Sequence, residues 1–312
     1  MGVDANLTSL HGYDVVDFEE GEPLPDPSQS AVRLALEYDG PFDDFSDLWP
    51  AFMESAGVEQ TEALVIGMWA NPEDGGQDSS EETVALLVAS ADRLPKLRAL
   101  FFGDITQEEN EISWIVQSDV SALWGAFPEL EEFGIRGGQN LQLGRIKHAK
   151  LKTLKVEAGG LPANVVREIS AADLPALEHL EIWLGTVNYG GDSQPQDLAP
   201  ILNGTRFPKL VTLALRNCEW ADELAAAVAA APILGRIKRL DLSMGTLTDA
   251  GVDALVASPA VRGLEHIDIA HHYVSPAGVA KLTALGIEVN AANRREAESY
   301  NDEEHRYIAV SE

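Results

Sequence analysis

The chain of 312 residues has few basic side chains, one cysteine and no long apolar run. Lysine and arginine number 22 against 51 acidic residues, which leaves a formal net charge of −29. Such a surface repels phosphate backbones, so the composition argues against nucleic-acid binding. The acidity either favours a partner with a cationic patch or simply keeps the protein soluble. Cys218 alone cannot form an intramolecular disulfide, which suits a reducing compartment.

Targeting and membrane signals are also lacking. No stretch approaches 18 consecutive apolar residues, and the first twenty residues lack a basic segment followed by an apolar one. We therefore expect no membrane span and a cytoplasmic location. Hydrophobic residues nevertheless make up 45% of the chain, which predicts a packed core in spite of the acidity.

Motifs for nucleophilic and phosphate chemistry are missing as well. The chain has no Gly-x-Ser-x-Gly elbow, and the glycine pairs in RGGQN and AGGLP lack the order of a phosphate loop. These glycines suit left-handed turns after strands. No cofactor is predicted.

An internal repeat is present instead. Four segments share an apolar residue, a proline and apolar residues at relative positions one, four and six: LPKLRALFF, FPELEEFGI, LPALEHLEI and FPKLVTLAL. AKLKTLKV, GRIKRLDL and RGLEHIDI carry the same core without the proline. The first core residues lie 21 to 33 residues apart, at Leu97, Leu130, Leu151, Leu177, Leu210, Ile237 and Leu264. This is the L-x-x-L-x-L core of a leucine-rich repeat.

Each core predicts a short strand, because L-x-L places two apolar residues on one face. Between the strands, ADELAAAVAAAPILG and LTDAGVDALVASPAV have helical spacing, with Asp222 or Thr248 as N-caps. Strands and helices that alternate at a fixed period require parallel strands. The prediction is a single α/β domain, a right-handed leucine-rich-repeat solenoid with strands on its concave face and helices on its convex face.

Residues 1–58 are expected to form an N-terminal cap with strands in YDVVDF and SAVRLALEY. About eight irregular repeats follow over residues 59–286, the first a degenerate copy in EALVIGM. Residues 287–312 then form a C-terminal cap, in which GIEVN and RYIAV are closing strands joined by the polar connection NRREAESYNDEEH.

Three segments of the repeat region resemble an uncharacterised family of bacterial leucine-rich-repeat proteins of the ribonuclease-inhibitor-like class. They are EENEISWIVQSDVSALWGAFPELEEFGIRGG, GGLPANVVREISAADLPALEHLEIWLGTVNYGGD, and LDLSMGTLTDAGVDAL followed by DIAHHYVS. The resemblance implies the solenoid fold and a cytoplasmic location, and by analogy of fold it implies protein binding through the concave face. It supplies no catalytic residues. In LRNC this repeat class usually buries a Cys or Asn, so Cys218 is expected to be structural.

The concave face should carry the residues two, four and six positions after each first leucine. Residues such as Ala99, Phe101, Glu132 and Gly134 then face inward without serving the core. The C-terminal half of this face is polar, and its side chains either pair across strands or bind a partner. They are His179, Glu181, Arg216, Arg239, Asp241, His266 and Asp268.

Trp183 ends one strand and leads into GTVNYGGDSQPQ, where the repeat is six residues longer than the two that follow it. The loop should overhang one rim of the solenoid. Its glycines permit a sharp turn, while Pro195 and Asp197 suit the first turn of the next helix. Trp183, Tyr189 and Asp192 form the candidate rim contact; the alternatives are that Trp183 packs under the loop and that Tyr189 only covers the core.

The segment HIDIAHHY suggests a transition-metal site, since imidazoles and carboxylates are suitable ligands. His266 and Asp268 share one face of the predicted strand, but His271 and His272 lie beyond its end and should diverge. The alternative is that one histidine packs at the turn and the others are solvated.

A basic island reverses the charge locally. It has no acidic residue and comprises Arg136, Arg145, Lys147, Lys150, Lys152 and Lys155. An acidic patch of a partner, or the acidic N-terminal region, would fit it. Alternatively, these residues pair with neighbouring Glu129, Glu131 and Glu132, each pair contributing less than about 1 kcal/mol.

Three functions are compatible with these patterns, and the last of them is a purely structural accessory role within an assembly. The first is a non-enzymatic module that binds another protein or peptide through the concave face and rim loop. The second is a metal-assisted hydrolase built on His266, Asp268 and His271.

Overall fold

The computed structural model describes residues 4–38, 40–71, 78–300 and 303–312, and the fold is a mixed α/β arrangement with mostly parallel strands. The chain divides into two compact units, residues 1–156 with 312 and residues 157–311, called unit 1 and unit 2 below. The division falls at the end of β7 (Thr153–Glu157). The assignment of the whole chain to one domain stays a prediction.

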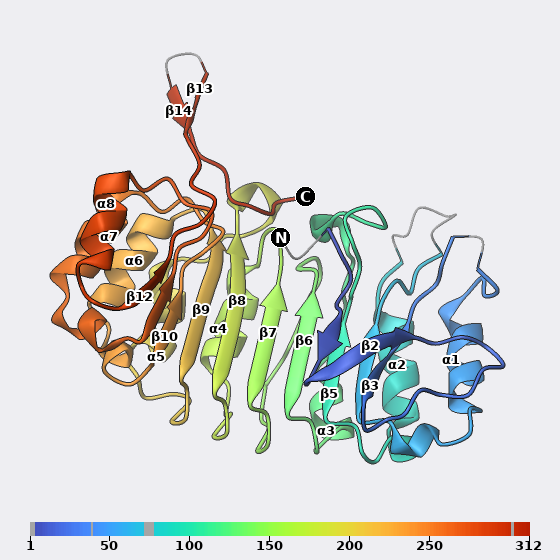
Figure 1. Ribbon diagram of the computed structural model, residues 1–312. Coiled ribbons are helices and arrows are strands. Elements are labelled where there is room, and N and C mark those ends of the chain that lie inside the picture. The colour runs from blue at the N-terminus through green and yellow to red at the C-terminus, as the bar shows by residue number, and fades with distance from the viewer. Residues whose placement is uncertain (1–3, 39, 72–77, 301–302) are drawn as a thin grey trace. The chain divides into compact units, whose positions relative to one another are not determined.

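Unit 1 contains strands that follow the chain order and pair with their neighbours (Figure 1). β1 and β2 are antiparallel, and β2 to β6 pair in parallel. Its strands are β1 (Ser9–Leu10), β2 (Tyr13–Asp17), β3 (Ser30–Leu34), β4 (Ala63–Ile66), β5 (Ala99–Phe102), β6 (Glu132–Arg136) and β7. Its α-helices are α1 (Phe45–Met53), α2 (Glu81–Ala89) and α3 (Leu123–Ala126).

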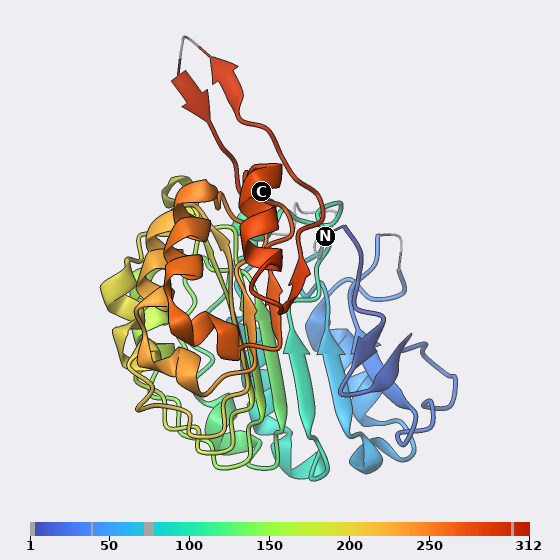
Figure 2. The same cartoon turned by 60° about the vertical axis from the view of Figure 1, so that its left-hand side comes forward.

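Unit 2 has its helices on one side of the strands (Figure 1 and Figure 2). Parallel pairing runs in order through β8 (His179–Gly185), β9 (Thr212–Cys218), β10 (Arg239–Asp241), β11 (His266–Asp268) and β12 (Glu288–Asn290). The helices are α4 (Ala163–Ser170), α5 (Ala199–Leu202), α6 (Ala221–Ala229), α7 (Asp249–Ala257) and α8 (Pro276–Thr283).

The predicted strands are confirmed at all seven repeat cores, in EALVIGM, in both N-terminal segments and in GIEVN. Alternation explains why: Leu180, Leu213, Leu240 and Ile267 lie at matching positions of β8 to β11 and are fully buried. A helix does not follow every strand, however, because residues 137–152 between β6 and β7 contain none. This is the shortest repeat, and a connection of this length leaves little room for a helical crossover.

Two aspartates join successive repeats of unit 2. Thr248 is the N-cap of α7, as predicted, but Asp222 is not an N-cap. Asp222 lies in the first turn of α6 and accepts hydrogen bonds from the backbone N–H of Thr248 and of Gly251 at 2.8 and 3.0 Å. One repeat later Asp249 accepts from Ser275 in the same way. Each carboxylate therefore stabilises the start of the following helix.

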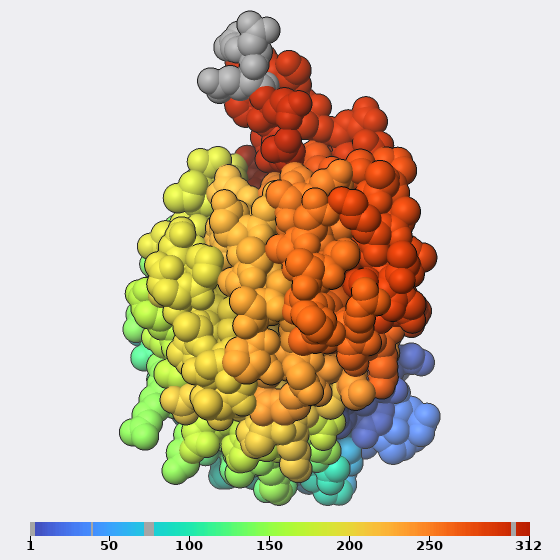
Figure 3. Space-filling model, turned by 90° about the vertical axis from the view of Figure 1, so that its left-hand side faces the viewer, coloured from blue at the N-terminus to red at the C-terminus, as the bar shows by residue number. Residues whose placement is uncertain are grey.

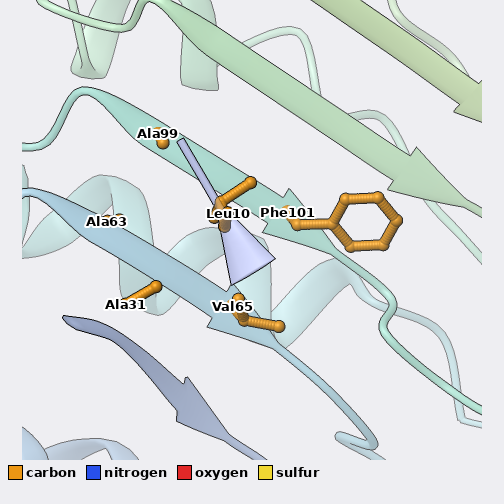
Figure 4. Packing of buried hydrophobic residues seen from close by; sticks show 6 residues of the cluster. All are labelled: Leu10, Ala31, Ala63, Val65, Ala99 and Phe101. Atoms are coloured by element: carbon orange, nitrogen blue, oxygen red, sulfur yellow. The ribbon is translucent and has the colours of Figure 1, made fainter. Parts of the chain in front are cut away.

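In unit 1 the chain covers one face of its own sheet. Leu10 of β1 belongs to one buried cluster with Ala31 of β3, Ala63 and Val65 of β4, and Ala99 and Phe101 of β5 (Figure 4). These five residues are called the covered face. The expectation that Ala99 and Phe101 do not serve the core is therefore wrong, since both are buried under the N-terminal segment.

The C-terminal region differs from its prediction in two places. NRREAESYNDEEH is not a plain connection but contains an antiparallel hairpin, β13 (Glu298–Tyr300) and β14 (Glu303–His305), which projects from unit 2 (Figure 3). RYIAV is not a strand. Its backbone is fixed by isolated hydrogen bonds, from Ala309 N–H to the carbonyl of Met244 at 2.8 Å and from Val310 N–H to Asn217 at 3.1 Å.

Among the described residues, no helix is long and apolar enough to cross a membrane.

Candidate functional site

The polar side chains predicted for the C-terminal half do share one face of unit 2. Strand register aligns His179, Thr212, Arg239, His266 and Glu288 in one row. The next row holds Glu181, Ala214, Asp241, Asp268 and Asn290. Trp183 and Arg216 pair one step further along β8 and β9. These residues, with Ser243, are called the open face, since most of its polar side chains remain partly exposed.

Arg216 lies at the centre of the most constrained part of the open face. Its Nη1 donates to Glu181 at 2.6 Å, and its Nε lies 3.3 Å from Asp241. The guanidinium carbon is 5.4 Å from the centroid of the Trp183 ring, a cation–π arrangement. The Trp183 Nε1–H in turn donates to Glu181 at 2.8 Å. Strand pairing and these bonds together fix the position of the guanidinium.

Trp183 is 2% exposed, so it is not a protruding anchor on the inner face. Its N–H is paired with Glu181 and Arg216 lies over its ring, while packing under the following loop stays a prediction. Because Glu181 accepts the Trp183 N–H, burial of the indole leaves no unpaired donor.

The pKa values of the two carboxylates around Arg216 are shifted in opposite directions. Burial disfavours the charged form of Glu181, but hydrogen bonding to His179, the charge of Arg216 and the Trp183 N–H outweigh it and lower its pKa from 4.5 to about 2. For Asp241, burial prevails over the charge of Arg216 and raises the pKa. Glu181 is therefore the firmly ionised partner.

The rest of the open face is paired less tightly. Asp268 accepts from Asn290 at 2.7 Å, and the Nδ1 of His266 lies 3.3 Å from Glu288. Arg239 is exposed. The expected ladder of cross-strand pairs is thus present, and it leaves exposed charges at Arg239 and Glu288.

The rim loop, residues 185–196, contacts the preceding repeat through a hydrogen bond and a close backbone approach. Asp192 accepts a hydrogen bond at 2.7 Å from the backbone N–H of Ala163, the first residue of α4, so it serves as a cap as well as a surface residue. A Cβ on Gly160 would lie 2.2 Å from the carbonyl oxygen of Tyr189, so the loop backbone rests on this glycine. The predicted helical start is confirmed, since Pro195–Leu198 is a 3₁₀ turn closed by Asp197.

The glycine pairs serve two different needs. Gly137 of RGGQN has a left-handed φ of 104°, as predicted. The glycines of AGGLP do not adopt positive φ, so that prediction is wrong for this pair. Close backbone approach to the rim loop requires Gly160 instead.

The histidine cluster does not assemble. His272 is buried, with Nε2 3.2 Å from the carbonyl of Ala291 and Nδ1 accepting from Val274 N–H. His271 is directed to the carbonyl of Tyr307 at 3.1 Å. Burial lowers the pKa of both imidazoles. Within residues 4–38, 40–71, 78–300 and 303–312, no group of three or more His, Cys, Asp or Glu is placed to hold a metal ion.

The basic island is not one surface. Lys150, Lys152 and Lys155 pair with Glu129, Glu131 and Glu132 respectively, which is the predicted internal balance. Arg136 is buried, 3.6 Å from Asp104 and over the ring of Phe101, so its inclusion in a surface patch is wrong. Arg145 and Lys147 are exposed.

Sequence reasoning missed three groups. Glu288 and Asn290 extend the open face, and the alternation in GIEVN, which repeats that of HID, could have placed them.

Asp104 is fully buried in unit 1, with Arg33 at 3.2 Å and both carboxylate oxygens 3.1 Å from Leu7 N–H. Burial raises its pKa in spite of Arg136 and Arg33. No local pattern marks this residue. Cys218 is buried, as expected.

No protein-family model matches the chain, and neither does any curated protein. Among solved structures, a Bacteroides fragilis protein determined as a structural genomics target is similar, with a TM-score of 0.79 and 28% sequence identity. The similarity covers 86% of this chain and 76% of that one. The two proteins therefore share a fold over most of this chain, and the description of the Bacteroides fragilis protein states no function.

Proposed function

We propose that this chain is a leucine-rich-repeat solenoid of the ribonuclease-inhibitor-like class, related to uncharacterised bacterial repeat proteins, and that it works as a non-enzymatic module binding a protein or peptide. The repeated strand cores and the Asp222 and Asp249 caps, 27 residues apart, support the repeat assignment. A cytoplasmic location is part of the proposal, because a buried free thiol suits a reducing compartment.

The open face of unit 2 is the observation that carries this function. Its side chains come from five adjacent strands, so the backbone holds them at fixed spacings. Glu181, Asp241, Asp268 and Glu288 stand against Arg216 and Arg239, which leaves an excess of carboxylates. A preorganised acidic surface favours a cationic partner and loses little side-chain entropy on binding.

Exposed members of the open face are the ones to test. Glu288→Lys reverses a charge on the face, while Glu223→Lys makes the same change at an exposed position of helix α6. Tagged wild-type and variant proteins would be used for affinity capture at low and high salt. We expect one partner to be retained at low salt by the wild type and Glu223→Lys, and lost by Glu288→Lys and at high salt.

Arg239→Ala is a second probe of the same face and should alter capture without altering the fold, because the side chain is exposed. Trp183→Ala is unsuitable, since removing a buried indole would destabilise unit 2. Retention of the same partner by Glu288→Lys at low salt would contradict the proposal.

A further inference from the structure

A groove of about 420 Å³ lies in unit 1, away from the covered face and outside unit 2. It is formed where the parallel strands β2 and β3 end, beside helix α1. Its lining combines the four larger apolar side chains Phe18, Leu36, Phe42 and Leu48, beside Ala35 and Pro41, with the acidic residues Asp17, Glu19, Glu20 and Glu37. The inference drawn from it is independent of the function proposed for the open face.

The groove has an apolar floor that the fold leaves partly uncovered. Leu36 and Leu48 are buried, but Phe18 and Phe42 are only half-buried. Phe18 packs edge-to-face on Phe52, at 5.8 Å between ring centroids, which restrains its ring. An aliphatic side chain that packed on Phe18 and Phe42 would remove further apolar surface from water.

The rim carries negative charge without local compensation. Residues 1–60 contain 14 acidic side chains and one basic one, Arg33. Arg33 is already engaged by Asp17 at 3.0 Å, Asp104 at 3.2 Å and Glu109 at 3.6 Å. Glu19, Glu20 and Glu37 are exposed, and the described part of the chain shows no ion pair for them. A cationic group near the rim would therefore meet unopposed carboxylates.

From this combination we propose that the groove docks a short cationic peptide segment, with an aliphatic side chain on the Phe18 and Phe42 floor and flanking lysines or arginines on the Glu19, Glu20 and Glu37 rim. Charge complementarity selects the segment and steers its approach. The apolar floor distinguishes it from a merely basic chain.

The test uses two fluorescein-labelled peptides of equal charge and length, one alternating arginine with leucine and the other alternating arginine with glycine. Fluorescence anisotropy measures their binding to the full chain. We expect the leucine peptide to bind and the glycine peptide to bind at least about tenfold more weakly, because it cannot fill the floor.

Charge reversal then locates the binding. The triple variant Glu19→Lys, Glu20→Lys and Glu37→Lys should weaken the leucine peptide about tenfold or more. Asp173→Lys, Glu178→Lys and Glu223→Lys, on exposed residues of unit 2, make the same change in net charge and should alter affinity less than about twofold. Phe42→Ser should weaken only the leucine peptide.

Several outcomes would overturn the proposal. Equal losses in the two triple variants would mean general attraction to an acidic protein. Equal binding of the two peptides would mean that the floor is not used. Self-association of the unliganded chain in sedimentation, abolished by the groove variant, would identify a second copy as the occupant. None of these outcomes affects the Glu288→Lys test of the open face.

Discussion

The two units treat equivalent faces of their strands in opposite ways. In unit 1 the residues of β3, β4 and β5 beneath the chain's own β1 are apolar, with Leu10 on Ala31, Ala63 and Ala99. In unit 2 the strands carry charged rows that stay partly exposed. The difference shows that one strand pattern can build either an internal core or a surface, depending on whether another segment reaches it.

The buried charges differ in the same sense. Asp104 is fully buried in unit 1 and fastens the N-terminal segment through Leu7. Glu181 in unit 2 is held by Arg216, which is a quarter exposed, and by His179, which is nearly a third exposed. Asp104 thus holds the N-terminal segment over the covered face of unit 1, whereas Glu181 belongs to a partly exposed group of charges on the open face of unit 2.

The largest expected effect comes from Asp104→Ala. The change leaves Arg33 and Arg136 without their buried carboxylate and frees Leu7 N–H, so we expect a loss of about 3–5 kcal/mol in the free energy of unfolding. Urea unfolding measures it. Asp17→Ala is the matched control, because that carboxylate is 62% exposed in its pair with Arg33 and should cost less than about 1 kcal/mol. Similar losses of unfolding free energy in both variants would show that the buried Asp104 stabilises unit 1 no more than the exposed Asp17 does.

Leu10→Ala should have the next largest effect. Removing the side chain from the covered face costs about 2–3 kcal/mol and acts first on the N-terminal segment. Limited proteolysis and hydrogen exchange should show residues 4–13 opening before the rest of unit 1. Unchanged protection of this segment would mean that Asp104, and not Leu10, holds it in place.

Acid should act on the open face through Glu181. Because its pKa falls from 4.5 to about 2 on folding, the stability it contributes is present above pH 4.5 and is lost as the pH falls toward 2. The difference in unfolding free energy between wild type and Glu181→Gln should therefore be largest at neutral pH and shrink between pH 4.5 and 2. Burial raises the pKa of Asp104, so ionisation of this carboxyl disfavours folding. Its contribution to the free energy of unfolding therefore changes with pH in the opposite sense to that of Glu181. A pH-independent difference for Glu181→Gln would show that the carboxylate is not ionised by its partners.

Arg239→Ala should have the smallest effect on stability. The side chain is exposed on the open face, so the free energy of unfolding should change by no more than about 0.5 kcal/mol. Thermal unfolding beside Leu10→Ala measures the contrast directly. A loss comparable to that of Leu10→Ala would mean that the open face is as much a part of the core as the covered one.

Local pattern was enough to find most strands and the open face. Period-two alternation identifies β4 to β12, because each strand needs its leucines on one side whatever surrounds it. The same rule aligned His179, Glu181, Arg216, Asp241, His266 and Asp268, which the register confirms. It did not find the β13–β14 hairpin, since NRREAESYNDEEH has no apolar alternation.

Tertiary structure alone decided what covers each face. The contact between Leu7 and Asp104 spans 97 residues, and no window of sequence contains both partners. The same limitation explains Trp183, which local pattern placed on an open strand and which Arg216 and Glu181 turn into a buried side chain. Sequence periodicity therefore determined which side of a strand a residue occupies. Burial on that side depended on distant segments, because desolvation is a property of everything that packs around a group and not of its own spacing.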